Sequence, residues 1–211
     1  MSVDPKLAIN YANRSSKHQK EVYGLWAENY DHDLINDFGY VAHEEAVMAL
    51  QRHKPATTTP IVDVGCRTGL VGKVLTSKGY QTIDGLDLSS EMFAKAFSLG
   101  IYRHLPQWDL AEKFKLPAIY GVILCLGVFS HNPAHAFQLA KLFQGLLPSG
   151  LLIVTVNGKG WEEINWLDLL NKSSHKHDLS VETITDIPYL VKQKIEGKLL
   201  VLKDNVGNRG L

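Results

Sequence analysis

Ile61-Val62-Asp63-Val64-Gly65-Cys66-Arg67-Thr68-Gly69-Leu70 is the stretch that decides the fold of this chain. It begins with the apolar pattern of a buried strand, continues through a glycine-containing turn and opens a helix. A strand, a tight turn and a helix N-terminus together bring backbone N–H groups up to a nucleotide-like ligand. The carboxylate of Asp63, at the strand end, suits a cationic or hydroxyl-bearing ligand better than a pyrophosphate.

Strand and helix patterns alternate after this turn, which predicts a parallel sheet with right-handed crossovers. The predicted strands cover 61–64, 81–86, 105–108, 122–126 and 151–156, and the predicted helices cover 70–77, 90–99, 133–146 and 161–172. Near the C-terminus, apolar segments at 189–195 and 199–203 are joined by Glu196-Gly197-Lys198. That arrangement is typical of a β-hairpin.

The N-terminal quarter has a different pattern. Residues 6–52 place apolar side chains at helical spacing, with a break at Asp37-Phe38-Gly39, and a proline-containing loop follows at 54–60. With 211 residues, the chain predicts a single domain. We expect a helical cap over 1–54, a ligand-binding core over 60–156, and a C-terminal helix with the hairpin over 157–211.

Composition narrows the class of protein. Lys and Arg total 22 and so do Asp and Glu, so no basic field is available to attract nucleic acid. Cys66 and Cys125 stand in apolar, strand-like contexts, which favours buried, reduced thiols over a disulfide or a zinc site. Neither a signal peptide nor a membrane-spanning stretch is indicated. We therefore expect a soluble, cytoplasmic protein.

The turn and the segments after it resemble the motifs of class I S-adenosylmethionine-dependent methyltransferases. Residues 63–69 are similar to the family pattern Asp/Glu-x-Gly-x-Gly-x-Gly, with Arg67 in place of the middle glycine. Gly85-Leu86-Asp87-Leu88-Ser89-Ser90-Glu91-Met92 is similar to Gly-x-Asp-x-Ser-x-x-Met, and Trp108-Asp109-Leu110 to the third motif. Asp87 is 22 residues beyond Gly65, the separation at which a carboxylate accepts hydrogen bonds from ribose hydroxyls.

The resemblance implies a Rossmann-like α/β fold, with a mostly parallel seven-stranded sheet, an antiparallel C-terminal hairpin and an N-terminal helical cap. It also implies S-adenosylmethionine as the cofactor. The cofactor contacts that it implies are Asp63, Gly65, Cys66, Arg67, Gly69, Asp87, Leu88, Met92, Asp109, Leu110 and Leu126. A dinucleotide cofactor is disfavoured, because Gly-x-Gly-x-x-Gly would require glycine where Arg67 and Leu70 stand.

The N-terminal segment resembles a narrower group, the Williams–Beuren critical-region methyltransferase-like family. The resemblance lies in residues 23–34, which carry Tyr-x-x-Trp-Ala-x-x-Tyr-Asp-x-Asp-Leu, and in Tyr40-Val41-Ala42, where His43 replaces the expected proline. It implies that this segment caps the cofactor pocket and that Tyr30 faces the methionine part. Trp26 is expected to pack the helix onto the core.

Arg67 leaves three alternatives. Its side chain pairs with the carboxylate of the cofactor, points into solvent, or obstructs the pocket. We expect that cofactor binding is retained, at full or reduced affinity, since the rest of the motif set is intact. A positive φ at this position costs a non-glycine residue on the order of 1 kcal/mol.

The sequence gives fewer indications about the methyl acceptor than about the cofactor. S-adenosylmethionine carries an already activated methyl, so the protein must mainly align a nucleophile with it. His131 is the candidate general base. A histidine in such a position is more often a surface residue of a helix N-terminus or loop, without a catalytic role. No histidine spacing indicates a metal site. A small-molecule acceptor is expected; the alternative is a catalytically silent cofactor-binding protein that acts through a partner.

Overall fold

The computed structural model describes residues 16–108, 116–117, 119–131 and 138–205. Its helices are α2 (Ser16–Trp26), α3 (Tyr30–His32), the π-helical turn η1 (Asp33–Asp37), α4 (Ala42–Arg52), α5 (Leu70–Ser77), α6 (Ser90–Ser98), α7 (Val128–His131), α8 (Leu139–Phe143), α9 (Gly158–Glu162), α10 (Trp166–His177) and the 3-10 turn η3 (Val191–Gln193). Its strands are β1 (Ile61–Val64), β2 (Ile83–Leu86), β3 (Tyr120–Leu126), β4 (Leu146–Asn157), β5 (Leu179–Leu190) and β6 (Ile195–Asp204).

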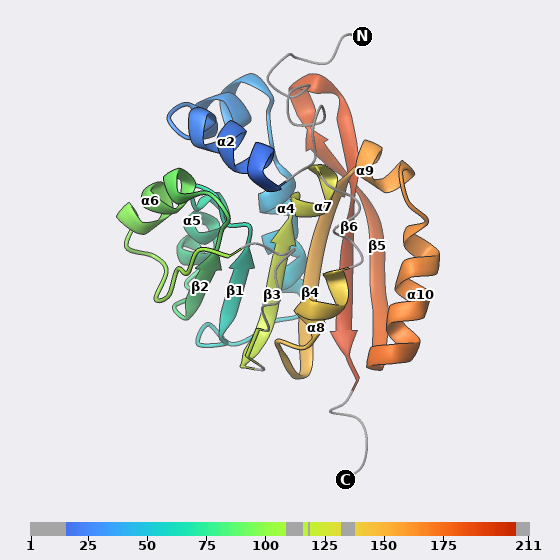
Figure 1. Ribbon diagram of the computed structural model, residues 1–211. Coiled ribbons are helices and arrows are strands. Elements are labelled where there is room, and N and C mark those ends of the chain that lie inside the picture. Colours follow the sequence, from blue (N-terminus) through green and yellow to red (C-terminus); the bar gives the residue numbers. More distant parts are fainter. Residues whose placement is uncertain (1–15, 109–115, 118, 132–137, 206–211) are drawn as a thin grey trace.

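The six strands form one sheet in the order β2-β1-β3-β4-β6-β5. The first four run parallel, and β6 inserts antiparallel between β4 and the edge strand β5. The mostly parallel sheet with an antiparallel C-terminal hairpin is therefore confirmed. Figure 1 shows α2 lying beyond the carboxyl ends of β1 and β3.

The core lies on both faces of the sheet because successive strand residues point to opposite sides. On β1, Ile61 packs in the cluster that holds α4 and α5, whereas Val62 packs in the cluster that holds α8 and α10. On β3, Leu124 and Cys125 alternate in the same way. All four of these strand residues are fully buried, as a sheet covered by helices on both faces requires.

One strand of the predicted seven is absent from the described residues, which corrects the expected count. The segment 103–108 runs beside β2, with Arg103 N–H donating to Ile83 O (2.8 Å) and Trp108 N–H donating to Asp87 O (2.8 Å). Only an isolated bridge, between Asp87 and Gln107, has strand geometry. Pro106 interrupts the segment, and a proline has no N–H to donate to a ladder.

The C-terminal hairpin forms, but the predicted turn at Glu196-Gly197-Lys198 is wrong. The chain reverses at η3 and at Lys194, whose φ is +54°. Gly197 lies inside β6, opposite Asn157 and Ile187. A Cβ there would meet the carbonyl oxygen of Val156 at 2.6 Å, so glycine is needed for close strand approach and does not mark the turn.

The remaining helices differ in their bounds. The helix predicted over 161–172 is divided into α9 and α10. The helix predicted over 133–146 is represented by α8, with β4 beginning at Leu146; residues 132–137 are outside the described residues. In the N-terminal part the expected break is confirmed, since Gly39 has φ of +68° between η1 and α4. No helix among the described residues has the length and apolar character needed to cross a membrane.

Candidate functional site

The β1–α5 turn folds back over the end of β2. The backbone N–H groups of Gly65 and Cys66 donate to the carbonyl of Leu86 at 2.7 and 3.0 Å. Gly65 and Gly69 both have positive φ, +74° and +92°, which glycine adopts at no steric cost. A Cβ on Gly65 would meet Val128 Cγ2 at 2.5 Å, so this turn can carry no side chain at its first glycine.

Asp87 connects the turn to the end of β2. Its Oδ2 accepts the backbone N–H of Arg67 at 2.8 Å, and its Oδ1 accepts that of Ser89 at 2.9 Å. Asp87 is only 7% exposed. Burial raises the pKa of Asp87 above its ordinary value, and the two backbone N–H groups act in the opposite direction. A carboxylate has about four acceptor sites, so both oxygens can still accept a ligand hydroxyl.

The side chain of Arg67 lies across the carboxyl ends of the central strands. Its Nη1 donates to Leu126 O at 3.1 Å, and its Nη2 is 3.4 Å from Gly127 O and 3.4 Å from Tyr23 Oη. The guanidinium carbon stands 5.3 Å from the centre of the Tyr23 ring, within cation–π range. Its backbone has φ of +49°, in the left-handed region, which a non-glycine residue adopts at a cost. The Arg67 side chain therefore lies inside the pocket and does not point into solvent.

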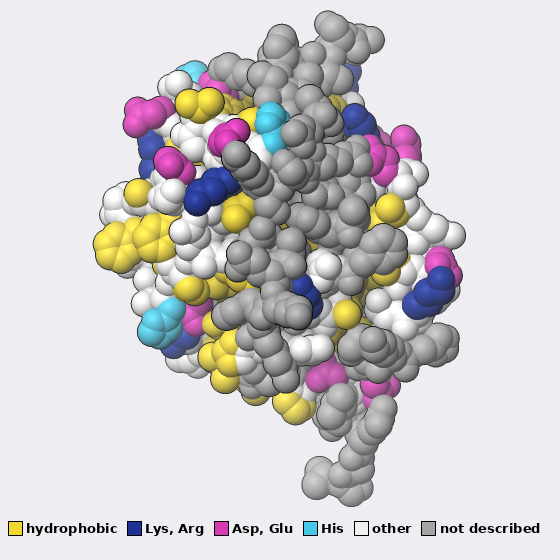
Figure 2. All heavy atoms as spheres, viewed as in Figure 1, with side chains coloured by type: hydrophobic (Ala, Val, Ile, Leu, Met, Phe, Trp, Pro, Cys, Tyr) yellow, Lys and Arg dark blue, Asp and Glu magenta, His cyan; other side chains and the backbone are white. Residues whose placement is uncertain are grey.

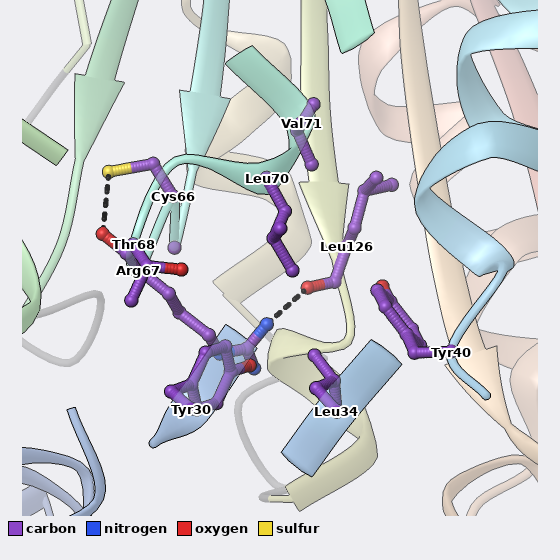
Figure 3. Close-up of a pocket in the computed structure, with 10 residues that line it drawn as sticks. Tyr30, Leu34, Tyr40, Cys66, Arg67, Thr68, Leu70, Val71 and Leu126 are labelled. Carbon is purple, nitrogen blue, oxygen red and sulfur yellow. Dashed lines mark hydrogen bonds between the residues drawn. The ribbon is translucent and has the colours of Figure 1, made fainter. Parts of the chain in front are cut away.

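A small cavity remains at this place (Figure 3). It is lined by Tyr30, Leu34, Tyr40, Gly65, Cys66, Arg67, Thr68, Leu70, Val71 and Leu126. Figure 3 shows the Arg67 side chain reaching past Tyr30 to the carbonyl of Leu126. The volume is about 20 Å³, room for about one water molecule.

Aromatic side chains of the N-terminal segment close this cavity. Tyr30 is 3% exposed, and its ring meets Trp26 edge-on at 4.8 Å and Tyr23 at 6.1 Å. The Trp26 Nε1–H donates to Asp33 Oδ2 at 2.7 Å, which holds the indole against η1. The predicted N-terminal helical cap is therefore present, and Tyr30 lies on the side of it that faces the cavity.

Polar contacts fasten the cap to the helix that follows the turn. Asp31 Oδ1 accepts a hydrogen bond from the Thr68 hydroxyl. Asp31 Oδ2 forms an ion pair with Lys73 Nζ at 2.9 Å. The Lys73 and Asp31 side chains are both about two-fifths exposed, so the ion pair is worth little by itself. Together with Arg67 and Tyr23, these contacts join α2 and α3 to the β1–α5 turn.

Tyr102 is a residue of the site that the motifs do not indicate. Its hydroxyl donates to Asp63 Oδ2 at 2.8 Å, and Asp63 is 1% exposed. Burial raises the pKa of Asp63 to about 7, against the lowering effects of the Tyr102 hydrogen bond and the Arg67 charge. The signal in the sequence is indirect: Gly69, Gly72 and Gly85 all lie against the Tyr102 ring.

The Tyr102 ring makes Gly72→Ala a destabilising change despite its place inside α5. Alanine should gain about 1 kcal/mol in helix propensity, but its Cβ would meet Tyr102 Oη at 2.6 Å and Cζ at 2.7 Å. We expect a net loss of about 2 kcal/mol in the free energy of unfolding. Urea denaturation measures it, and in a Tyr102→Leu background the same substitution should be neutral or stabilising. An equal loss in both backgrounds would contradict this explanation.

The predicted site residues are only partly brought together. Tyr30, Gly65, Cys66, Arg67 and Leu126 line the cavity. The other predicted residues that the structure describes do not line it: Asp63 within β1, Gly69 just before α5, Asp87 and the half-buried Leu88 after β2, and Met92, fully buried in the core. His131 ends α7, and its side chain is not described. Asp109 and Leu110 lie outside the described residues.

Cys66 contributes packing and no reactive thiolate. It is 3% exposed and packs with Ala96 and Leu105. Burial raises the pKa of the Cys66 thiol well above its ordinary value. Cys125 is fully buried in β3 and is likewise a free thiol. Both cysteines are thus reduced and buried, as predicted.

The donor set fits a nucleoside with hydroxyl groups and a cationic end. Asp87 offers a buried carboxylate beside the turn, and the carbonyls of Leu126 and Gly127 face a cation. The free volume does not fit such a ligand, because the guanidinium of Arg67 already occupies the cationic end. Binding of a ligand of that size requires the Arg67 side chain to move.

The comparisons with known proteins agree with this geometry. The chain is 30% identical over 138 residues to human methyltransferase-like protein 27, covering 63% of this chain and 55% of that protein. It is 26% identical over 146 residues to the ubiquinone biosynthesis O-methyltransferase of Rickettsia canadensis, covering 67% and 61%. The chain thus spans 55 to 61% of the length of these curated relatives. No family model matches the chain.

Solved structures share the fold at low sequence identity. The [4+2]-cyclase SpnF superposes with a TM-score of 0.70 at 13% identity, over 92% of this chain and 97% of its own. An S-adenosylmethionine-dependent methyltransferase from Mesorhizobium loti superposes with a TM-score of 0.57 at 17% identity, over 74% and 96%. Likeness at such identities establishes the fold alone.

The narrower relationship to the Williams–Beuren critical-region group is supported only weakly by the partial match to the human protein. The broader resemblance is supported by both kinds of comparison. The sequence relatives are named as a methyltransferase-like protein and an O-methyltransferase, the structural neighbours include S-adenosylmethionine-dependent methyltransferases, and the chain has the Rossmann-like fold of these methyltransferases.

Proposed function

We propose that this protein is an S-adenosylmethionine-dependent methyltransferase. The observation that carries the proposal is the meeting of the Gly65–Gly69 turn with the Asp87 carboxylate at the carboxyl ends of β1 and β2. Ligands of open α/β sheets bind at this edge, where the strand order reverses, and here the order reverses at β1. The relatives in sequence are methyltransferases.

When bound, the cofactor supplies an activated methyl on a sulfonium. The contribution of this chain is placement. Asp87 holds hydroxyl groups, and the buried ring of Tyr30 with the partly buried ring of Trp26 excludes water from the strand ends. Water exclusion strengthens each electrostatic contact in the pocket.

We further propose that the methyl acceptor is a small polar molecule. An open groove of about 630 Å³ lies between the α2–α3 cap and α5 and α6, and Thr68 borders both this groove and the cavity. Its volume is in the range of small-molecule sites. Its lining includes charges of both signs, from Glu28, Lys73 and Lys95. Among the described residues on the face shown in Figure 2, basic and acidic side chains are interspersed.

A second candidate is a catalytically silent protein that binds the cofactor and acts through a partner. The small volume left beside Arg67 favours it over ready turnover. Methyl transfer to a panel of phenols, thiols, amines and carboxylates separates the two candidates. An enzyme methylates at least one class, whereas a silent protein binds the cofactor and methylates none.

Calorimetric titration tests the proposed cofactor directly. We expect micromolar binding of S-adenosylmethionine and of its demethylated product, S-adenosylhomocysteine, and no binding of NAD, because Arg67 and Leu70 stand where a dinucleotide turn needs glycine. NAD binding without S-adenosylmethionine binding would show an oxidoreductase on the same fold and would contradict the proposal.

A further inference from the structure

Arg67 is placed where a ligand of this fold should lie. The chain runs from β1 to β2 on one side and places β3 on the other, so the crevice outside β1 and β3 is the switch point of the sheet. The guanidinium crosses this crevice and reaches the last carbonyl of β3, at Leu126, and the carbonyl of Gly127 beyond it. A side chain of the protein thus fills the ligand position.

The surroundings of the guanidinium form a cation-binding subsite. Two backbone carbonyls, of Leu126 and Gly127, and the hydroxyl oxygen of Tyr23 lie within 3.4 Å of its nitrogens. The face of the Tyr23 ring adds a cation–π contact at 5.3 Å. Asp63 and Asp87 lie close enough for their charges to be coupled to that of Arg67. Carbonyls, an aromatic face and two nearby carboxyl groups all favour a positive charge.

The backbone at Arg67 adds an independent observation. Its φ of +49° lies in the left-handed region, which a residue with a Cβ adopts at a cost that glycine does not bear. Its N–H is fixed by Asp87, so the backbone can remain in place while the side chain moves. Fastening of the cap through Asp31, Thr68 and Lys73 does not depend on the guanidinium.

We infer that Arg67 is a built-in competitor of the cofactor: its guanidinium occupies the cation subsite of the pocket and must leave before a cationic cofactor binds. This inference rests on the proposed function, since S-adenosylmethionine carries both an ammonium and a sulfonium charge. The apparent affinity equals the intrinsic affinity multiplied by the fraction of molecules in which the subsite is vacant. Arg67 therefore sets the affinity for the cofactor through the contacts that it must give up.

The first experiment compares binding of S-adenosylmethionine, which carries both positive charges, and of S-adenosylhomocysteine, which keeps only the ammonium, to the wild type, Arg67→Ala, Arg67→Gly and Arg67→Lys by calorimetry. Loss of the guanidinium should tighten binding at least tenfold in the alanine and glycine variants, and less in the lysine variant, which keeps a cation. Glycine also relaxes the backbone, so the alanine variant isolates the side chain. Arg52→Ala, an exposed arginine on α4, is the matched control and should bind like the wild type. Unchanged or weaker binding by Arg67→Ala would overturn the inference, since Arg67 would then be neutral or a cofactor ligand.

The second experiment tests the subsite without the cofactor. Methylguanidinium at millimolar concentration should raise the thermal midpoint of Arg67→Ala by filling the vacated subsite, and should leave the wild type and Arg52→Ala unchanged. No difference among the three proteins would overturn the subsite. If methylguanidinium stabilises Arg67→Ala while no variant binds S-adenosylmethionine or S-adenosylhomocysteine, the subsite is supported and the proposed function is what fails.

Discussion

Asp87→Ala is expected to weaken S-adenosylhomocysteine binding by at least a hundredfold. The substitution removes the carboxylate that we assign to the ribose hydroxyls, and charge-assisted hydrogen bonds of this kind are the stronger class. It also leaves the backbone N–H groups of Arg67 and Ser89 without their acceptor, so the turn loses its support from β2. Calorimetric titration gives the affinity, and circular dichroism confirms that the variant is folded.

Two further variants separate ligand contact from folding. Asp87→Asn keeps the size of the side chain but loses one acceptor oxygen, so its affinity should lie between those of the alanine variant and the wild type. Asp84→Asn alters a second buried aspartate, which lies within β2 and is paired with Arg103 at 2.8 Å and with the Tyr120 hydroxyl at 3.1 Å. It should lower stability and leave binding unchanged. Equal affinity losses in Asp84→Asn and Asp87→Asn would refute the specific role of Asp87.

The sequence predicts those parts of the fold that local patterns specify. The strand at 61–64 and the helix at 70–77 have the predicted bounds, because an apolar run and two glycines leave few alternatives there. Ser89 is the N-cap of α6 and accepts from the Met92 N–H, as a serine before a helical pattern suggests. The break near Gly39 follows from a positive φ that few other residues adopt as readily.

The parts that the sequence does not predict depend on contacts between distant segments. Gly197 has the composition of a turn, yet its lack of a side chain serves the approach of β6 to β4 and to Tyr189. The position of the Arg67 side chain depends on Leu126 and Tyr23, which lie 59 and 44 residues away. Motif spacing predicts the position of the turn backbone but does not predict the direction of a long side chain.

The Asp63–Tyr102 pair belongs to the same class of long-range feature. Tyr102 is 39 residues from Asp63 and belongs to no motif. Its position follows from packing, because its ring lies against glycines of α5 and of β2. A buried carboxyl group with a hydroxyl donor has a measurable consequence for stability, which depends on pH.

Stability should fall as the pH rises from about 4 to about 7, and Asp63 should be the cause. The pKa of Asp63 is raised to about 7 by burial, whereas the unfolded chain has the ordinary value near 3.8. Between these values the folded protein holds a proton that the unfolded chain has lost, so this contribution to stability is present below the lower value and is lost through the upper one. The slope is about 1.4 kcal/mol per pH unit, and the total is at most about 4 kcal/mol.

Asp63→Asn isolates this contribution. The amide cannot ionise and still offers Tyr102 an oxygen acceptor, so the variant should lose the part of the slope that Asp63 contributes and exceed the wild type in stability by a few kcal/mol at pH 8. A slope of the same sign remains from Asp87, whose pKa burial also raises. Urea denaturation at pH 5, 6, 7 and 8 measures both proteins, and parallel curves would disprove the assignment. Tyr102→Phe removes a hydrogen bond that lowers the Asp63 pKa, and Arg67→Ala removes a charge that does the same. Either variant should extend the slope to higher pH, which ties the stability of the fold to the residue that fills the cofactor pocket.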